Sequence, residues 1–114
     1  MLKMLSTYLG RLGYKVTTAG STEKAWDEIA AAPERFVMAV LDATMTGIGV
    51  EDLASRMMAA NRRLCVIVAS GYPVDMTALQ AAAPGRVTFL HKPFTPEMLA
   101  GAVRRMLATQ EKAV

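Results

Sequence analysis

Two short, unbroken apolar runs constrain this chain more than any other feature. They span residues 36–41 (FVMAVL) and 64–69 (LCVIVA), and each has the length of a strand rather than that of a helix. A strand with one solvent-exposed face alternates apolar and polar residues, whereas a strand covered on both faces is apolar throughout. Both runs lie between segments with helical spacing, so we expect an α/β fold in which helices cover both faces of a parallel sheet.

Helical and strand-like segments alternate along the whole chain. Helices are expected over residues 2–12, 21–32, 51–60, 74–82 and from 95 onward, and strands over residues 14–19, 36–41, 64–69 and 86–90. Local signals support these bounds: Ser21 and Thr95 are N-cap residues, whereas Gly13 and Pro33 are stop signals. The pattern therefore predicts alternating helices and strands from one end to the other.

Composition excludes several classes of protein. The chain has 114 residues, 53% of them hydrophobic, which suits one domain over residues 1–114 with its own core. A single Cys and a single His exclude a disulfide framework and a Cys/His zinc site. No apolar run approaches the length of about 20 residues that spans a membrane, so we expect a cytoplasmic protein that does not bind membranes. The net charge is +3 and the basic residues are spread along the chain, so we expect no binding of nucleic acid.

Polar residues follow the expected strands where each strand ends. Asp42 follows the second strand, Ser70 the third, and His91 and Lys92 the fourth. The carboxyl ends of parallel strands meet at one edge of the sheet, where open α/β folds place their sites. A carboxylate can accept a phosphoryl group, and a hydroxyl and an ammonium can hold its oxygens. The combination points to phosphoryl chemistry.

Each of these residues also has an ordinary structural explanation. An Asp after a strand commonly caps a turn or a helix, a Ser before Gly commonly belongs to a turn, and a Lys before Pro is commonly a solvated charge. His91 suits a solvated position at the rim of the site. The joint occurrence of Asp42, Ser70 and Lys92, each at its own strand end, is much more specific than any one of them.

Four motifs resemble those of response-regulator receiver domains of two-component signalling. They are LGYKV at 12–16, VLDATM at 40–45, VASGYP at 68–73 and FLHKPF at 89–94. The residues SGYP and KPF within the last two motifs are most similar to those in receivers of hybrid sensor histidine kinases. The resemblance covers essentially the whole chain. It implies a flavodoxin-like, doubly wound parallel sheet with strand order 2-1-3-4-5.

The resemblance also implies a role for individual residues. Asp42 matches the phospho-acceptor, Ser70 the switch hydroxyl, Lys92 the cation that pairs with the phosphate or with Asp42, and Phe89 the aromatic switch. The peptide bond between Lys92 and Pro93 is expected to be cis.

Further implied roles concern the metal and the rim of the site. The resemblance implies Mg²⁺ bound by Asp42 and the backbone carbonyl of Thr44, whereas Thr44 and Tyr72 match positions that flank the site and tune the lifetime of the phosphate.

The chain departs from the family pattern at its N-terminus and after Asp42. The given sequence begins inside the first helix, so the family's first strand and acidic pair are absent from it. A gap with unpaired strand edges is therefore expected between residues 15–19 and 37–41. Mg²⁺ affinity should fall without those acids. Thr46 replaces the usual Pro, and Val50 the usual Gly, with Gly49 one residue earlier.

Two explanations of the gap stay open, and with them two functions. Either the natural chain starts further upstream, or it is truly short and closes the gap by rearrangement or by intermolecular pairing, as in a strand-swapped homodimer. The first favours a non-enzymatic switch in which Asp42 takes a phosphoryl group from a histidine kinase or phosphotransfer protein. The alternative is a degenerate receiver-like module for interaction or dimerisation that is no longer phosphorylated.

Overall fold

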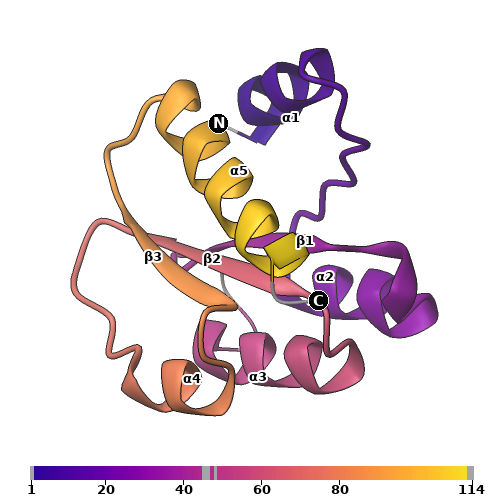
Figure 1. The fold of residues 1–114 in the computed structure, drawn as a ribbon, viewed down its shortest axis with the longest axis vertical. Coiled ribbons are helices and arrows are strands. Elements are labelled where there is room, and N and C mark those ends of the chain that lie inside the picture. Colours follow the sequence, from indigo (N-terminus) through magenta and orange to yellow (C-terminus); the bar gives the residue numbers. More distant parts are fainter. Residues whose placement is uncertain (1, 45–46, 48, 113–114) are drawn as a thin grey trace.

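A parallel sheet of three strands forms the centre of the computed structural model, which describes residues 2–44, 47 and 49–112 (Figure 1). The strands are β1 (Met38–Asp42), β2 (Cys65–Ser70) and β3 (Val87–His91), in the order β1-β2-β3. In the register, Asp42 lies beside Ala69, and Ser70 lies beside His91. The carboxyl ends of the strands therefore meet at one edge, as the apolar runs predict.

Five α-helices and one short 3-10 turn surround the sheet in the described residues. They are α1 (Leu2–Arg11), α2 (Thr22–Ala31), η1 (Pro33–Arg35), α3 (Val50–Ala60), α4 (Thr77–Ala82) and α5 (Pro96–Lys112). The expected bounds are met within one or two residues except in α4, which begins at Thr77 rather than at residue 74. The Asp75 carboxylate accepts a hydrogen bond from the Thr77 backbone N–H, so residues 75–77 form a turn before the helix.

Local chemistry explains the helix ends. The Ser21 hydroxyl accepts a hydrogen bond from the Lys24 backbone N–H (3.2 Å), and the Thr95 hydroxyl accepts one from the Met98 N–H (3.1 Å). Both are N-caps that satisfy a donor left free at the first turn of a helix. Gly13 follows α1 with a φ of +98°, a conformation that glycine adopts without a Cβ clash.

Two apolar clusters cover the two faces of the sheet. Alternate residues of the fully buried strand β2 enter different clusters: Val66 and Val68 pack with α2, α3 and α4, whereas Ile67 packs with α5 and α1. Figure 1 shows these helices on opposite sides of the strands. Both clusters are needed because each face of a parallel sheet is apolar. No helix in the described part of the chain is long and apolar enough to cross a membrane.

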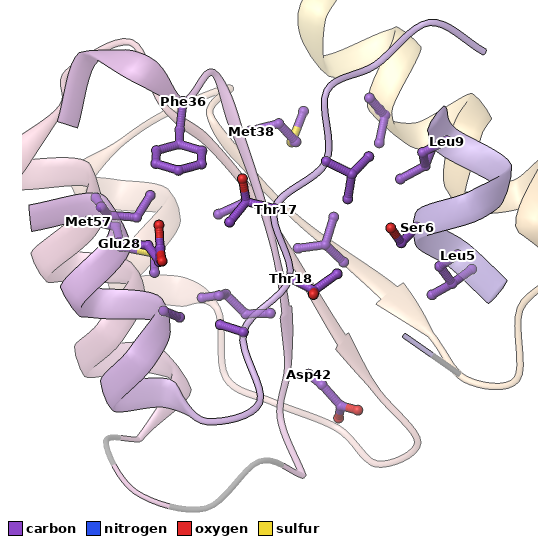
Figure 2. A pocket seen from close by; sticks show the side chains of 18 of the residues that line it. Leu5, Ser6, Leu9, Thr17, Thr18, Glu28, Phe36, Met38, Asp42 and Met57 are labelled. Carbon is purple, nitrogen blue, oxygen red and sulfur yellow. The ribbon is translucent and has the colours of Figure 1, made fainter. Parts of the chain in front are cut away.

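The expected strand over residues 14–19 is wrong. The structure assigns no regular element to this segment, and the described sheet contains no fourth strand. Tyr14–Ala19 has the β-branched composition of a strand, but a strand also needs a neighbour with which to form hydrogen bonds. The segment lies across a gap from β1 (Figure 2), so the predicted gap with unpaired edges is present in the described residues.

Two polar side chains tie the amino ends of the strands together. The Asn61 amide donates to the backbone carbonyls of Pro33 (2.7 Å) and Phe36 (2.8 Å), just before β1. The Arg86 guanidinium donates to the carbonyl of Leu64 (3.1 Å), just before β2, and to that of Asn61 (2.9 Å). This junction, formed by Asn61 and Arg86, supplies side-chain donors to backbone carbonyls in the loops that lead into β1 and β2.

Candidate functional site

An ion pair joins two of the predicted site residues at the carboxyl edge of the sheet. The Lys92 ammonium nitrogen lies 2.8 Å from Asp42 Oδ2, and the two side chains are 20% and 25% exposed. The Lys92 backbone N–H donates to the Ser70 carbonyl (2.8 Å), so Lys92 is fixed at the end of β2 and reaches across it to β1. The structure therefore brings Asp42 and Lys92 together.

The second carboxylate oxygen of Asp42 is held by Thr44. Asp42 Oδ1 accepts hydrogen bonds from the backbone N–H of Thr44 (2.9 Å) and from its hydroxyl (2.7 Å). Both oxygens of Asp42 are thus oriented, one by a cation and one by a turn that the carboxylate itself stabilises. This places Thr44 directly beside the carboxylate rather than only at the rim of the site.

The surroundings of Asp42 favour its ionised form. Partial burial by itself raises the pKa of the Asp42 carboxyl, but the hydrogen bonds from Lys92 and Thr44, together with the Lys92 charge, outweigh it and hold that pKa below its ordinary value. Asp42 is therefore a carboxylate at neutral pH. It is also accessible enough to react, because a quarter of its side chain is exposed.

Ser70 and Tyr72 occupy the turn after β2. Ser70 is fully buried, and its hydroxyl accepts a hydrogen bond from the Tyr72 backbone N–H (3.1 Å). These two described residues, Ser70 and Asp42, share no hydrogen bond. The Tyr72 hydroxyl donates to the Ala43 carbonyl (3.1 Å), directly after the carboxylate residue. The Tyr72 ring, 51% exposed, thereby links the loop after β2 to the loop after β1.

The aromatic position Phe89 lies on β3, away from the carboxylate. Its half-buried ring packs against the cluster on the α4 side of the sheet and meets the His91 ring edge to face at 6.1 Å. His91 is exposed, as expected for a rim position. Phe89 therefore lies on β3, the strand that leads to Lys92, but its ring packs in the apolar cluster and not among the polar side chains.

Two backbone features shape the loop that carries Lys92. The Lys92–Pro93 peptide bond is cis, the isomer that the resemblance implies. Gly71, in the facing turn, lies next to the aliphatic stem of Lys92, because a Cβ on Gly71 would be 3.8 Å from the Lys92 Cβ. The close approach of the two turns allows the ammonium group to reach Asp42.

The loop after Asp42 is described in part. Gly47 has a φ of +105°, and a Cβ there would collide with the Glu23 carboxylate and the Thr22 hydroxyl, so glycine is required. Gly49 is the N-cap residue of α3, which begins at Val50. The replacement of the usual Pro by Thr46 lies outside the described residues.

The residues of the site do not by themselves form a magnesium site. Among the described residues, no three His, Cys, Asp or Glu side chains come together as metal ligands. Asp42 is the carboxylate that pairs with Lys92 at this edge, and its two oxygens already face Lys92 and Thr44. Mg²⁺ needs six oxygen ligands in octahedral geometry and binds proteins through carboxylates and phosphate oxygens, so one shared carboxylate is a poor basis for it.

Contacts of two residues near the site could not be predicted from the sequence. The Tyr72 phenol was expected near the site, but its bond to the Ala43 carbonyl depends on the distance between two loops, which no local pattern encodes. Glu23 was not singled out at all, although its carboxylate lies against Gly47. Its position in the first turn of α2 is typical of a helix-stabilising acid and gave no sign of a contact with the Asp42 loop.

The chain and its fold are similar to those of known proteins. A family model described as the response regulator receiver domain matches residues 1–104. The receiver domain protein (CheY-like) from Methanospirillum hungatei JF-1 superposes with a TM-score of 0.81 at 21% identity, covering 99% of this chain and 89% of that one. A receiver domain protein from Clostridium thermocellum gives a TM-score of 0.82 at 18% identity, covering 99% and 90%.

Two curated relatives are more similar in sequence than these structures. The DNA-binding transcriptional regulator NtrC of Rhizobium meliloti (strain 1021) is 33% identical over 109 residues, which are 96% of this chain and 22% of that protein. The corresponding regulator of Azospirillum brasilense is 31% identical over 104 residues. The chain spans about a fifth of the length of these curated relatives.

Proposed function

The chain belongs to the response regulator receiver domain family, and from this premise we propose that it is a signalling switch in which Asp42 accepts a phosphoryl group. The observation that carries the proposal is the pairing of Asp42 with Lys92 at 2.8 Å. The family match and the position at the carboxyl edge of the sheet support it. The chain then acts as an acceptor domain rather than as an enzyme.

The proposed transfer uses the two oxygens of Asp42 differently. One carboxylate oxygen attacks the phosphorus of a phosphohistidine on a histidine kinase or phosphotransfer protein. The phosphorus–nitrogen bond breaks, the imidazole leaves with its electron pair and takes a proton from solvent, and Asp42 becomes an acyl phosphate. Lys92 faces this oxygen and stabilises the negative charge of the transferring group.

The proposed response begins at Ser70. Its buried hydroxyl bonds to the Tyr72 N–H, and a phosphoryl group on Asp42 offers three stronger acceptor oxygens one strand away. Rotation of the hydroxyl toward them would release Tyr72 and change the packing of Phe89 on the next strand. The altered surface then changes contacts with a protein partner.

Magnesium has no step in this proposal. Receiver domains generally bind Mg²⁺ at the phosphorylation site, where the ion would neutralise phosphate charge. In the part of the chain that the structure describes, no three His, Cys, Asp or Glu side chains come together to hold such an ion. Lys92 and Thr44 are the groups that orient Asp42 for the transfer.

Incubation with acetyl phosphate tests the function directly. Intact-mass spectrometry should show the added mass of one phosphoryl group, which hydroxylamine removes because it cleaves acyl phosphates. The variant Asp42→Asn should stay unmodified, whereas Asp75→Asn, which removes an exposed carboxylate elsewhere, should be modified like the unaltered chain. Modification that persists in Asp42→Asn would refute the assignment.

The interaction module without phosphorylation is a second candidate. The observation that favours it is that, among the described residues, no three His, Cys, Asp or Glu side chains come together to hold a metal ion. It predicts an unchanged mass with acetyl phosphate and with a phosphorylated histidine donor, together with oligomerisation or partner binding that neither donor alters. Labelling of Asp42 by either donor would exclude it.

A further inference from the structure

The first turn of α2 lies against the loop that follows Asp42. A Cβ placed on Gly47 would collide with both carboxylate oxygens of Glu23 and with the Thr22 hydroxyl, so these polar atoms already fill the space beside the Gly47 Cα. Gly47 accommodates them because its φ of +105° belongs to a conformation that glycine adopts without strain. We call Thr22, Glu23 and Gly47 together the loop seat.

The α2 side of the loop seat is firmly held. The Ser21 hydroxyl accepts a hydrogen bond from the Lys24 N–H (3.2 Å), and the Ser21 carbonyl accepts one from the Ala25 N–H (3.0 Å), so the first turn is capped. Thr22 is 3% exposed, and Ile29, further along the helix, is buried in the apolar cluster that α3 shares. The loop therefore rests against a turn whose own position is fixed.

Backbone hydrogen bonds hold the loop at its two ends. The Ala43 N–H donates to the Ala69 carbonyl (2.9 Å) where the loop leaves β1, and the Gly49 carbonyl accepts from the Leu53 N–H (2.9 Å) where α3 begins. Gly47 lies between these ends, so the loop seat holds the loop at a third point.

The path of the loop determines how Asp42 is oriented. Asp42 Oδ1 accepts hydrogen bonds from the N–H (2.9 Å) and the hydroxyl (2.7 Å) of Thr44, which belongs to the same loop. A shift of the loop moves both donors together, because they come from one residue. Hydrogen bonds weaken steeply as their geometry departs from linear. The orientation of the Asp42 carboxylate is therefore sensitive to the contacts that fix the loop.

We propose that Glu23 is a positioning residue for Asp42: its carboxylate lies against Gly47 and keeps the loop on the path in which Thr44 orients the acceptor. Glu23 is exposed, so it can serve the loop without serving the core, whereas Thr22 is buried. A glutamine should replace it, because glutamine has the same shape and retains one oxygen. The consequence for phosphoryl transfer rests on the proposed function of Asp42, whereas the contact itself does not.

Three variants of the full chain test the proposal, with acetyl phosphate as donor and intact-mass spectrometry as readout. Glu23→Ala removes the contact and should lower the maximal rate of labelling about fivefold, with the half-saturating donor concentration unchanged, because orientation affects the transfer and not the encounter. Glu23→Gln should restore the rate. Asp27→Ala removes an exposed acid one turn further along α2 and should be labelled like the unaltered chain.

A double variant tests the contact between the two elements. Gly47→Ala places a Cβ where the Glu23 carboxylate lies and should displace the loop, so labelling should fall further than in Glu23→Ala. In Gly47→Ala/Glu23→Ala the added Cβ meets one group fewer, so the loss should be smaller than the product of the two single losses. Losses that multiply would show that the two residues act independently and would overturn the proposal. If Gly47→Ala does not fold, the comparison of Glu23→Ala with Glu23→Gln decides the question.

The Thr44 amide gives a second readout that needs no phosphoryl donor. Its N–H donates to Asp42, so hydrogen exchange at Thr44 should be faster in Glu23→Ala than in the unaltered chain and normal in Glu23→Gln. Either unchanged exchange at Thr44 or an unchanged rate of labelling in Glu23→Ala would overturn the proposal. Equal losses in Glu23→Ala and Glu23→Gln would also overturn it, because they would assign the effect to the charge of a first-turn acid. An unaltered chain that no donor labels would refute the proposed function alone, and exchange at Thr44 would still decide the role of Glu23.

Discussion

Asp42 keeps its negative charge at a partly buried position because Lys92 and Thr44 together favour the anion more strongly than burial opposes it. The same contacts that make it a candidate acceptor therefore stabilise the fold. The size of that contribution to the free energy of unfolding depends on pH, because the contacts with Lys92 and Thr44 stabilise only the ionised carboxylate.

The acid limb of the stability curve measures this contribution. The folded-state pKa of Asp42 lies below its ordinary value of 3.8, so the stabilisation is fully present above about pH 5 and is lost as pH falls through the folded-state pKa. In urea unfolding, the advantage of the unaltered chain over Asp42→Asn should therefore shrink between about pH 5 and about pH 2. Asp75, whose pKa is also lowered, is common to both chains and cancels. A difference that grows toward acid would contradict the assignment.

The link between Tyr72 and Ala43 should be weak. The ring is 51% exposed, so Tyr72→Phe should lower the free energy of unfolding by no more than about 0.5 kcal/mol, because water replaces the lost partner of the Ala43 carbonyl. The control is Tyr8→Phe on α1, which should leave the free energy of unfolding unchanged. Chemical denaturation of the three chains makes the comparison. A loss above about 1.5 kcal/mol in Tyr72→Phe would show that the two loops depend on this bond.

At the residue scale, the sequence predicted which polar groups meet but not how they bond. Asp42 and Lys92 follow different strands, and parallel topology alone brings them to one edge. The double hydrogen bond from Thr44 and the phenol contact of Tyr72 depend on turn geometry, which is set by the folded loops.

The elements of the fold follow local signals wherever the chain supplies its own hydrogen-bond partners. Helices satisfy their backbone internally, so caps such as Ser21 and Thr95 fix where they begin. A strand depends on a neighbour, and for this reason the β-branched residues 14–19 misled the prediction. The apolar runs at residues 36–41 and 64–69 were correctly assigned because each one pairs with the other.

The junction of Arg86 and Asn61 should be among the most sensitive contacts between elements. Arg86→Met keeps the aliphatic stem but removes the donors to the carbonyls of Leu64 and Asn61, and should cost about 2–3 kcal/mol in urea unfolding. Arg62→Met, which alters an exposed arginine near the same loop, should stay within about 0.5 kcal/mol. Similar losses in both variants would mean that the guanidinium bonds are replaceable by water.

Across the whole molecule, the cluster between α5 and β2 joins two layers. Leu99 is 1% exposed and packs with Ile67 of β2, so Leu99→Ala should cost about 2–5 kcal/mol through lost burial and the cavity left behind. Leu12→Ala, at a position 52% exposed, should be nearly neutral. Thermal unfolding of both variants tests the pair. A small loss of stability in Leu99→Ala would show that neighbouring side chains move in to fill the cavity.

The two ends of the sheet are held by different kinds of contact. At the amino ends, the side chains of Asn61 and Arg86 bind backbone carbonyls that precede β1 and β2. At the carboxyl ends, backbone hydrogen bonds from Ala43 to Ala69 and from Lys92 to Ser70 continue the pairing of the strands, and the charged contact is the one between the side chains of Asp42 and Lys92. A change of charge on Asp42 would therefore act on one end of the sheet only, and the uncharged carbonyl contacts at the other end would keep the spacing of the strands.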